Sequence, residues 1–298
     1  MPAGGWRKWQ GRKDSNLGPS VLETDALTRL SYAPSPETIL PDAQRLTSEP
    51  DYSPGVAAGD LPILIAGDVH GDLERLFSAL KPYPADSWRT IFLGDLVDYG
   101  AFGVGALRYA RDRANTEVVL GNHEVAMLWA LRDPARVGFW MGIGGQPHDL
   151  DELAKDKTLQ DWLRRRPSLI RLSDRTLVQH CGNDSYGKLV EKDDANPVES
   201  INRRVHDLLE SGGEADLWDM MSGRNIFTTQ PDRLERWLEM TETRRVVFGH
   251  SPHRGARPEI YFGGKAINFD GGFSRHHRLY RRLTPPGATV APLAPLPG

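Results

Sequence analysis

The sequence predicts a domain of the α/β class that begins near residue 61. Two observations support this class. From that point on, short apolar runs end in small or polar residues, and each of the first three runs is followed by a segment whose apolar side chains recur at helical spacing. Strands that alternate with helices in this way are typical of sheets whose neighbouring strands are parallel.

The first half of the domain is expected to contain strands and helices in strict alternation. Residues 61–66, with the sequence Leu-Pro-Ile-Leu-Ile-Ala, form an apolar run of the length of a buried strand. Asp72 precedes the first helical segment and can accept hydrogen bonds from its free N–H groups. The strands are expected at residues 61–66, 89–93 and 117–120, and the helices at residues 72–80, 104–113 and 124–131.

The second half of the domain is expected to be richer in helix. Residues 149–166 and 198–240 show helical periodicity over most of their length. Residues 185–197 and 210–214 contain the residue types of surface loops. Further strands are expected at residues 175–179, 244–248, 265–269 and 277–283.

The two ends of the chain differ from the domain in composition. Seven of the 22 Pro residues lie in residues 1–60 and five lie in residues 281–298. Residues 1–58 have no sustained helical or strand periodicity, which predicts a disordered N-terminal extension. The domain is therefore expected at residues 59–284, followed by a Pro-rich C-terminal tail at residues 285–298.

Two alternatives stay open for the N-terminal extension. Residues 14–20 and 25–27 resemble a pattern found where a predicted reading frame crosses a neighbouring transfer-RNA gene, in which case the true start lies downstream. The other alternative is an arm that binds a partner through Trp6 and Trp9.

The composition excludes several classes of protein. A single Cys can form neither an intramolecular disulfide nor a cysteine-based zinc cluster, so a secreted disulfide scaffold is excluded and a cytoplasmic location is expected. No apolar run approaches the roughly 18 residues of a membrane span. The 37 basic and 40 acidic residues are balanced, which gives no sign of nucleic-acid binding. We expect neither a membrane nor a nucleic acid as partner, and the oligomeric state stays open.

Residues able to bind a metal ion follow five of the predicted strands, where an α/β sheet binds its ligands. Asp68 and His70 are two positions apart, so both side chains point the same way on an extended segment. Any one of these residues alone is explained by a helix cap, a turn or the core. Together they form a set of oxygen and nitrogen donors without thiolate, which suits manganese, iron or zinc better than calcium. The set comprises Asp68, His70, Asp95, Asn122, His180 and His250.

The order and spacing of these residues resemble the calcineurin-like metallophosphoesterase superfamily, in particular its phosphoprotein phosphatase and bacterial diadenosine tetraphosphatase branch. The resemblance spans residues 61–284. It rests on the motifs Asp68-x-His-Gly, Gly94-Asp-x-x-Asp, Gly121-Asn-His-Glu, His180-x-Gly and Gly249-His-x-Pro, all in the family's order.

This resemblance implies both a fold and an activity. The fold would consist of two mixed β-sheets packed face to face with flanking helices. The activity would be hydrolysis of a phosphomonoester, with a serine/threonine phosphoprotein as the first candidate substrate and a dinucleoside polyphosphate such as diadenosine tetraphosphate as the alternative. A hypothesis of another class is a binding or scaffold module with weak catalysis.

The resemblance also implies roles for individual residues. Asp68 and His70 would hold the first of two divalent ions, Asp95 would bridge both, and Asn122, His180 and His250 would complete the second site. Manganese is the first expectation, with iron or zinc as alternatives. A hydroxide shared by the two ions would attack phosphorus in line. His123 would be the general acid, oriented by Asp98.

Two positions depart from the phosphoprotein phosphatases. Tyr99 and Leu120 stand where those enzymes have Arg residues that bind the substrate phosphate. A Tyr hydroxyl cannot reproduce the bidentate contact of a guanidinium group, so other groups must bind the phosphate. Arg224 and Arg254, together with Tyr99, are the candidates. Asp270 is expected to have a structural or supporting role rather than to be a ligand.

Overall fold

The computed structural model describes residues 61–191, 194–276 and 289–296. The extension expected at residues 1–58 and the strand expected at residues 277–283 lie outside these ranges. Within them, no helix is both long and apolar enough to cross a membrane.

The first sheet contains the three parallel strands of the N-terminal half. Its order is β3 (Thr116–Val118), β2 (Arg89–Phe92), β1 (Ile63–Ala66) and β9 (Val290–Pro292). Strand β9 pairs antiparallel to β1, so the sheet is mixed. The Pro-rich segment at residues 285–298, which we expected to be a tail, thus contributes a strand. Its Pro292 lies on an edge strand, where a residue without an N–H group is tolerated.

The second sheet is built from the C-terminal half. Its order is β4 (Leu169–Arg171), β5 (Thr176–Cys181), β6 (Arg245–Gly249), β8 (Ala266–Asn268) and β7 (Glu259–Tyr261). The central strands β5, β6 and β8 are parallel, and the two edge strands are antiparallel to their neighbours.

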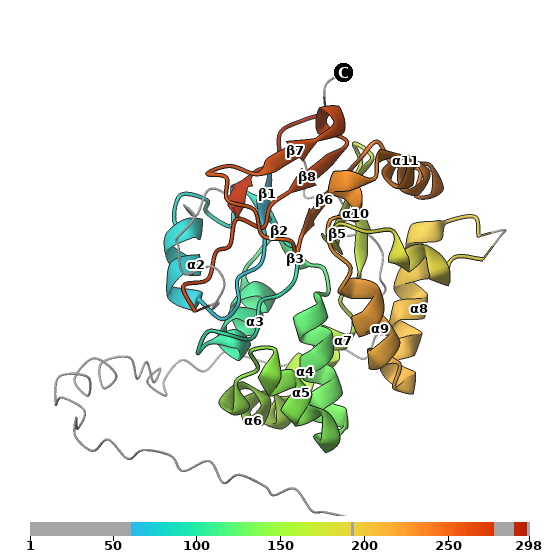
Figure 1. The fold of residues 1–298 in the computed structure, drawn as a ribbon. Coiled ribbons are helices and arrows are strands. Elements are labelled where there is room, and N and C mark those ends of the chain that lie inside the picture. The colour runs from blue at the N-terminus through green and yellow to red at the C-terminus, as the bar shows by residue number, and fades with distance from the viewer. Residues whose placement is uncertain (1–60, 192–193, 277–288, 297–298) are drawn as a thin grey trace, which may run out of the picture. The chain divides into compact units, whose positions relative to one another are not determined.

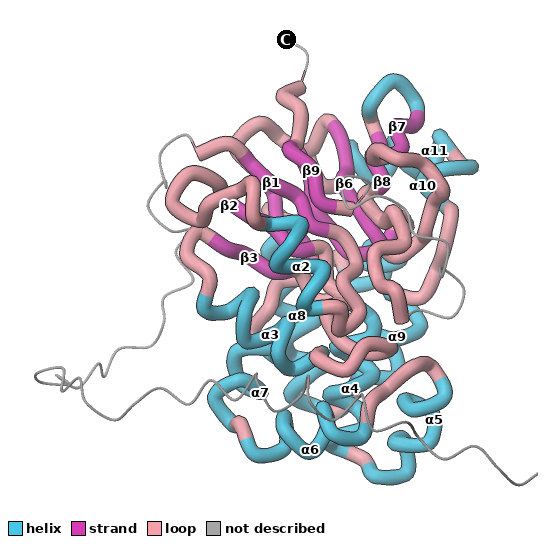
Figure 2. The backbone as a smooth tube through the Cα atoms, turned by 90° about the vertical axis from the view of Figure 1, so that its left-hand side faces the viewer, coloured by secondary structure: helices cyan, strands magenta, loops and turns pink. Residues whose placement is uncertain are grey.

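Each sheet packs one of its two faces against the other sheet and its opposite face against helices. Side chains of a strand point alternately to opposite faces, and the core divides accordingly. Ile65 and Ile91 of the first sheet share one apolar cluster with Val178 and Val247 of the second. Their neighbours along the strands, such as Leu64, belong to a second cluster formed with the helices. Figure 2 shows the strands gathered together and helices around them.

The helices cover the outer faces of both sheets. In Figure 1, α2 and α3 lie beside the first sheet, α10 and α11 lie beside the second, and α4, α5 and α6 form a group at one end. The helices are α2 (Leu73–Leu80), α3 (Gly103–Asp112), α4 (Asn122–Arg132), α5 (Val137–Gly142), α6 (Pro147–Lys155), α7 (Lys157–Arg164), α8 (Pro197–Ser211), α9 (Glu214–Met221), α10 (Ile226–Thr229) and α11 (Pro231–Met240). Short 3₁₀ turns lie at Pro134–Arg136, Ser185–Leu189 and Phe262–Gly264.

The alternation predicted for the first half is confirmed, with each element displaced by no more than a few residues. The loop expected at residues 210–214 is shorter than predicted. Helix α8 continues to Ser211 and α9 begins at Glu214, with a break at Gly212, whose φ of 91° ends the first helix. Strands β4 and β7, the two edge strands of the second sheet, were not predicted.

Candidate metal centre

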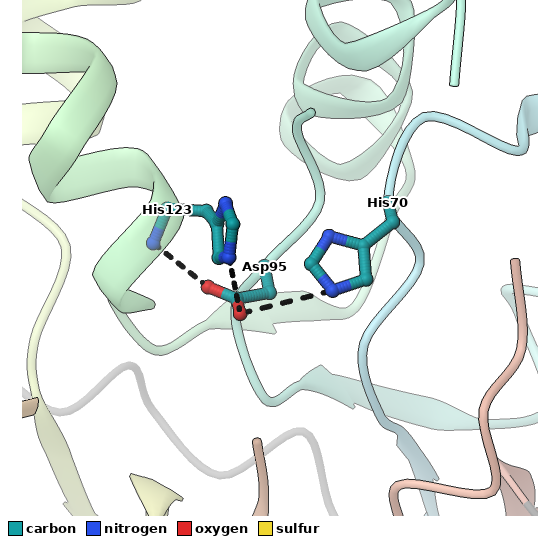
Figure 3. A group of neighbouring side chains, drawn as sticks. All are labelled: His70, Asp95 and His123. Atoms are coloured by element: carbon teal, nitrogen blue, oxygen red, sulfur yellow. Dashed lines mark hydrogen bonds and ion pairs between the residues drawn. The ribbon is translucent and has the colours of Figure 1, made fainter. Parts of the chain in front are cut away.

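Side chains from both sheets meet at the ends of their parallel strands. Asp68 and His70 follow β1, Asp95 follows β2, and Asn122 opens α4 just after β3. From the second sheet, His180 lies near the end of β5 and His250 directly follows β6. In Figure 3, His70 and His123 flank the carboxylate of Asp95 from opposite sides. The structure therefore brings the six sequence-predicted ligands together.

The backbone at this site is unusual. His70, Asp95 and His250 have φ values of 48°, 50° and 65°, in the left-handed region that residues other than Gly rarely occupy. Asp98 and Tyr99 lie in the same region, at 71° and 61°. Such conformations cost free energy and cluster at functional sites, where the surrounding structure imposes them.

Two glycines allow the loops after β2 and β3 to touch. A Cβ atom on Gly94, whose φ is 92°, would lie 2.6 Å from the backbone nitrogen of Gly121. A Cβ atom on Gly121 would lie 2.3 Å from the backbone nitrogen of Asp95. Larger residues would push apart the loops that carry Asp95 and Asn122.

Asp95 is the centre of the cluster. Its Oδ2 lies 3.9 Å from Nε2 of His70 and 3.9 Å from Nε2 of His123, while its Oδ1 lies 3.4 Å from Nε2 of His180. Two groups of three donors have all their ligand atoms within 4.8 Å of one another, and Asp95 belongs to both. The groups are His70, Asp95 and His123, and Asp95, His180 and His250. A carboxylate shared in this way is suited to bridge two cations.

The ring orientations of the histidines fit a cation. His180 donates from Nδ1 to the carbonyl of Leu93 at 2.7 Å, so its Nε2 faces Oδ1 of Asn122 at 2.8 Å and Oδ1 of Asp95. His70 likewise donates from Nδ1 to the carbonyl of Val97 at 3.0 Å. Metal-binding histidines donate their second N–H in this manner.

His250 gives a second test of the same fit. Its side chain is buried, and neither ring nitrogen has a hydrogen-bond partner among the residues that the structure describes. Burial and the nearby His180 lower the pKa of His250 well below its usual value, so the ring is neutral and able to bind a metal ion.

The buried carboxylates of the site repel one another. Burial, with the charges of Asp270 and Asp95, raises the pKa of Asp68 well above its usual value. Burial would also raise the pKa of Asp95, but the surrounding His180 and His123 hold that pKa well below its usual value. For His180, burial opposes protonation, yet the charge of Asp95 raises its pKa to about 9. Positive charge close to Asp95 therefore stabilises the buried carboxylates.

His123 is held by a chain of hydrogen bonds. Its Nδ1 lies 2.6 Å from Oδ2 of Asp98, and Oδ1 of Asp98 accepts a hydrogen bond of 2.9 Å from the indole N–H of Trp140. Burial lowers the pKa of His123, but Asp95 and Asp98 outweigh this and raise it above its usual value. This arrangement holds a proton on the ring.

Glu124 supports the site, and our sequence analysis missed its role. Its carboxylate accepts hydrogen bonds from the backbone N–H groups of Asp95 at 2.8 Å, Leu96 at 2.6 Å and Gly121 at 3.0 Å. It thereby joins the loop after β2 to the start of α4. The signal in the sequence was its place three residues after Gly121, the capping-box position at the start of a helix.

The three candidate substrate-binding residues differ in position. The ring of Tyr99 packs edge-on against His70 with centroids 4.9 Å apart. Arg224 lines the same pocket as the candidate metal ligands and donates from Nη1 to the carbonyl of His250 at 2.7 Å. Arg254 is exposed and is not among the described residues that line this pocket.

Comparisons with known proteins agree with this geometry. A family model described as calcineurin-like phosphoesterase matches residues 61–254. The symmetrical bis(5'-nucleosyl)-tetraphosphatase of Neisseria meningitidis is 29% identical over 125 residues, which are 39% of this chain and 41% of that protein. The chain thus matches about two fifths of the length of this relative.

Solved structures give the same fold. The cold-active protein-tyrosine phosphatase of a psychrophilic Shewanella species is 19% identical and has a TM-score of 0.53, with 72% of each chain covered. A second structure of a cold-active protein-tyrosine phosphatase is 20% identical, with a TM-score of 0.53 and coverage of 72% of this chain and 70% of that one. At this identity the likeness concerns the fold, with its two mixed sheets and flanking helices.

Proposed function

The chain belongs to the calcineurin-like phosphoesterase family, and we propose that it hydrolyses a phosphomonoester with the help of two divalent metal ions. The first candidate substrate is a protein phosphorylated on serine or threonine. The proposal rests on one cluster of side chains. Asp95 belongs to two groups of possible metal donors, and His123, which is paired with Asp98, lies next to Asp95.

The donor set divides between two ions. Asp68, His70 and Asp95 would hold one of them, and Asp95, Asn122, His180 and His250 would hold the other. We propose manganese, with iron or zinc as alternatives, because oxygen and imidazole donors without thiolate suit these ions. When bound, such ions act as Lewis acids on phosphoryl oxygens and lower the pKa of water.

His123 is proposed to protonate the leaving oxygen. Asp98 accepts a hydrogen bond from the Nδ1–H group of His123, so Nε2 of His123 is directed toward Asp95 and the pocket. Nδ1 of His123 is paired with the carboxylate of Asp98, whose charge stabilises the protonated ring, whereas Nδ1 of His180 donates to the uncharged backbone carbonyl of Leu93. His123 is therefore better suited to be the acid than to be a ligand.

Two side chains are proposed to bind the phosphate. Arg224 lies in the pocket wall, where its guanidinium group supplies positive charge. Tyr99 packs against His70 and His123, two side chains that line the pocket. Arg254, which is exposed, is proposed to contact the part of a substrate that extends beyond the pocket.

A dinucleoside polyphosphate is the second candidate substrate. Two observations favour it. The curated relative from Neisseria is named a bis(5'-nucleosyl)-tetraphosphatase, and Leu120 occupies the position before Gly-Asn-His where the tetraphosphatase branch has an apolar residue. We propose a cytoplasmic location for either activity, because the single Cys181 is buried and no disulfide can form within the chain.

One assay separates these activities. Purified full-length protein with manganese would be given a phosphoserine peptide, diadenosine tetraphosphate, a chromogenic monoester and a chromogenic diester, in parallel with the Asp95→Asn variant. We expect the monoester and the phosphopeptide to be hydrolysed and the variant to lose most of this rate. Preferred cleavage of diadenosine tetraphosphate would select the second candidate. Absence of cleavage by the wild type, or full activity of Asp95→Asn, would contradict the proposal.

A further inference from the structure

Asp270 lies in the wall of the pocket that holds the metal donors. It follows β8 by two residues, is 1% exposed, and lines the pocket with Asp68, His70 and His250. The loop after β8 also touches the loop after β1, since a Cβ atom on Gly67 would lie 2.5 Å from the carbonyl oxygen of Phe269. Asp270 is thus adjacent in space to the segment that carries Asp68.

The backbone around Asp270 holds its side chain in one orientation. Its N–H donates to Oδ1 of Asn268 at 2.9 Å, and its carbonyl accepts from the N–H of His253 at 2.9 Å. Its Oδ1 accepts from the N–H of Gly272 at 3.0 Å. Asn268 is itself tied to the carbonyl of Ser251 at 2.6 Å. The carboxylate is therefore preorganised by its own loop and by the loop after β6.

The second carboxylate oxygen, Oδ2, is buried and has no hydrogen-bond partner within the part of the chain that the structure describes. Leaving such an oxygen without a partner costs free energy, and the cost rises because Asp68 and Asp95 are also buried in the same pocket. Arg224 is a cation in this wall, but its Nη1 donates to the carbonyl of His250. A preorganised, unpartnered carboxylate oxygen in a pocket of metal donors indicates a cation as its partner.

We propose that Asp270 is a further carboxylate of the metal centre, whose Oδ2 directs negative charge at the ion held by Asp68. This inference rests on the proposed function, since it presupposes that the cluster binds divalent ions. Asp68 and Asp95 supply two negative charges against the four positive charges of two divalent ions. Asp98 adds little to this balance because His123 is its partner. Asp270 supplies the third charge, so its loss weakens the binding of the ion.

The test is a comparison of metal binding and stability in the Asp270→Asn variant, which keeps the shape of the side chain and removes its charge. Calorimetric titration of the metal-free full-length protein with manganese would give the affinities, and elemental analysis after dialysis would give the number of ions bound. We expect the affinity of one ion to fall by about tenfold to a hundredfold, the usual effect of removing a supporting carboxylate. The matched control is Asp149→Asn, a carboxylate that is 2% exposed but lies outside the described pocket, and this variant should retain wild-type affinity.

Thermal unfolding provides a second readout that a purely structural role would not produce. In the presence of a chelator, Asp270→Asn should unfold at the same temperature as the wild type or higher, because a buried unpaired charge is removed. With manganese, the variant should gain less stability than the wild type. Wild-type affinity for both ions in a folded variant, or a variant that is less stable without metal, would overturn the inference. A wild-type protein that binds no metal would instead overturn the proposed function.

Discussion

His123 shows how the surroundings of one residue prepare it for chemistry. Its ring cannot rotate freely, because Asp98 holds Nδ1 and Trp140 in turn holds Asp98. All three side chains are buried. Asp98 therefore favours one tautomer of His123, with the other ring nitrogen available to the pocket, and this geometry supports the proposed acid role.

The pair predicts a specific pH dependence. The general acid must be protonated, so activity should fall as the pH rises through the pKa of His123. Asp98 raises that pKa, and Asp98→Asn should therefore move the alkaline limb of kcat/KM to lower pH. His123→Ala should cost about 10² to 10⁴ in kcat for an alkyl phosphate, the usual range for a general acid, and less for a nitrophenyl ester, whose leaving group needs little protonation. Equal losses on both substrates, with an unchanged pH profile in Asp98→Asn, would contradict the acid role.

At the scale of elements, the site depends on the connection between the loop after β2, the loop after β3 and the start of α4. Glu124 belongs to α4, yet it accepts hydrogen bonds from the loop after β2 and from Gly121. Asp95, a proposed metal ligand, is thereby fixed by a residue that does not itself belong to the donor set. A buried carboxylate also joins two elements at α3, because Asp149 of α6 accepts hydrogen bonds from the first N–H groups of α3.

Removal of the Glu124 carboxylate should be strongly destabilising. Glu124→Ala would leave the buried N–H groups of Asp95, Leu96 and Gly121 without acceptors, at a cost of about 3 kcal/mol or more in the free energy of unfolding. Glu124→Gln keeps one acceptor oxygen and should lose less. Urea unfolding of metal-free protein would measure both. The control is Glu239→Ala on the exposed face of α11, for which a change within about 0.5 kcal/mol is expected. A loss in Glu124→Ala no larger than this control would show that the carboxylate does not hold the loops.

Asp149 should make stability depend on pH in the opposite sense to an ordinary carboxylate. Burial raises its pKa to about 6, above its usual value of 3.8. The folded state then binds the proton more tightly than the unfolded state, so the contribution of Asp149 to stability is complete below pH 3.8 and is lost as the pH rises toward 6. In urea unfolding between pH 4 and pH 7, the wild type should lose stability relative to Asp149→Asn. A constant difference between the two proteins across this range would show that the pKa is not raised.

At the scale of the whole molecule, the sequence could predict the strands and the donors but not their grouping into sheets. The apolar runs at β1 and β2 are buried on both faces, so no alternation marks which side chains face the other sheet and which face helices. Strand β9 was missed because Pro292 and its neighbours resemble a tail, and only pairing with β1 makes the segment a strand. Glu124 was not assigned to the site because its role arises from contacts with a distant loop, which one sequence does not reveal. Asp270 was expected to have a structural or supporting role, but its place in the wall of the pocket could not be read from the sequence.

This grouping has a consequence for stability. The donors come from both sheets: Asp68, Asp95 and Asn122 follow strands of the first sheet, whereas His180 and His250 belong to the second. Bound ions would therefore connect the two sheets at one end, in addition to the apolar contacts between their inner faces.

Metal removal should consequently affect the molecule far beyond the site. At a manganese concentration of about 100 times Kd, binding stabilises the folded state by about 2.7 kcal/mol, which raises Tm by about 5 to 11 °C for a domain of this size. Hydrogen exchange should slow in the strands of both sheets when manganese is added to chelator-treated protein. His180→Ala should abolish much of the added protection in both sheets, because the link between them is lost, whereas Glu239→Ala should retain it. Protection confined to the first sheet, or a Tm unchanged by manganese, would contradict a centre shared between the sheets.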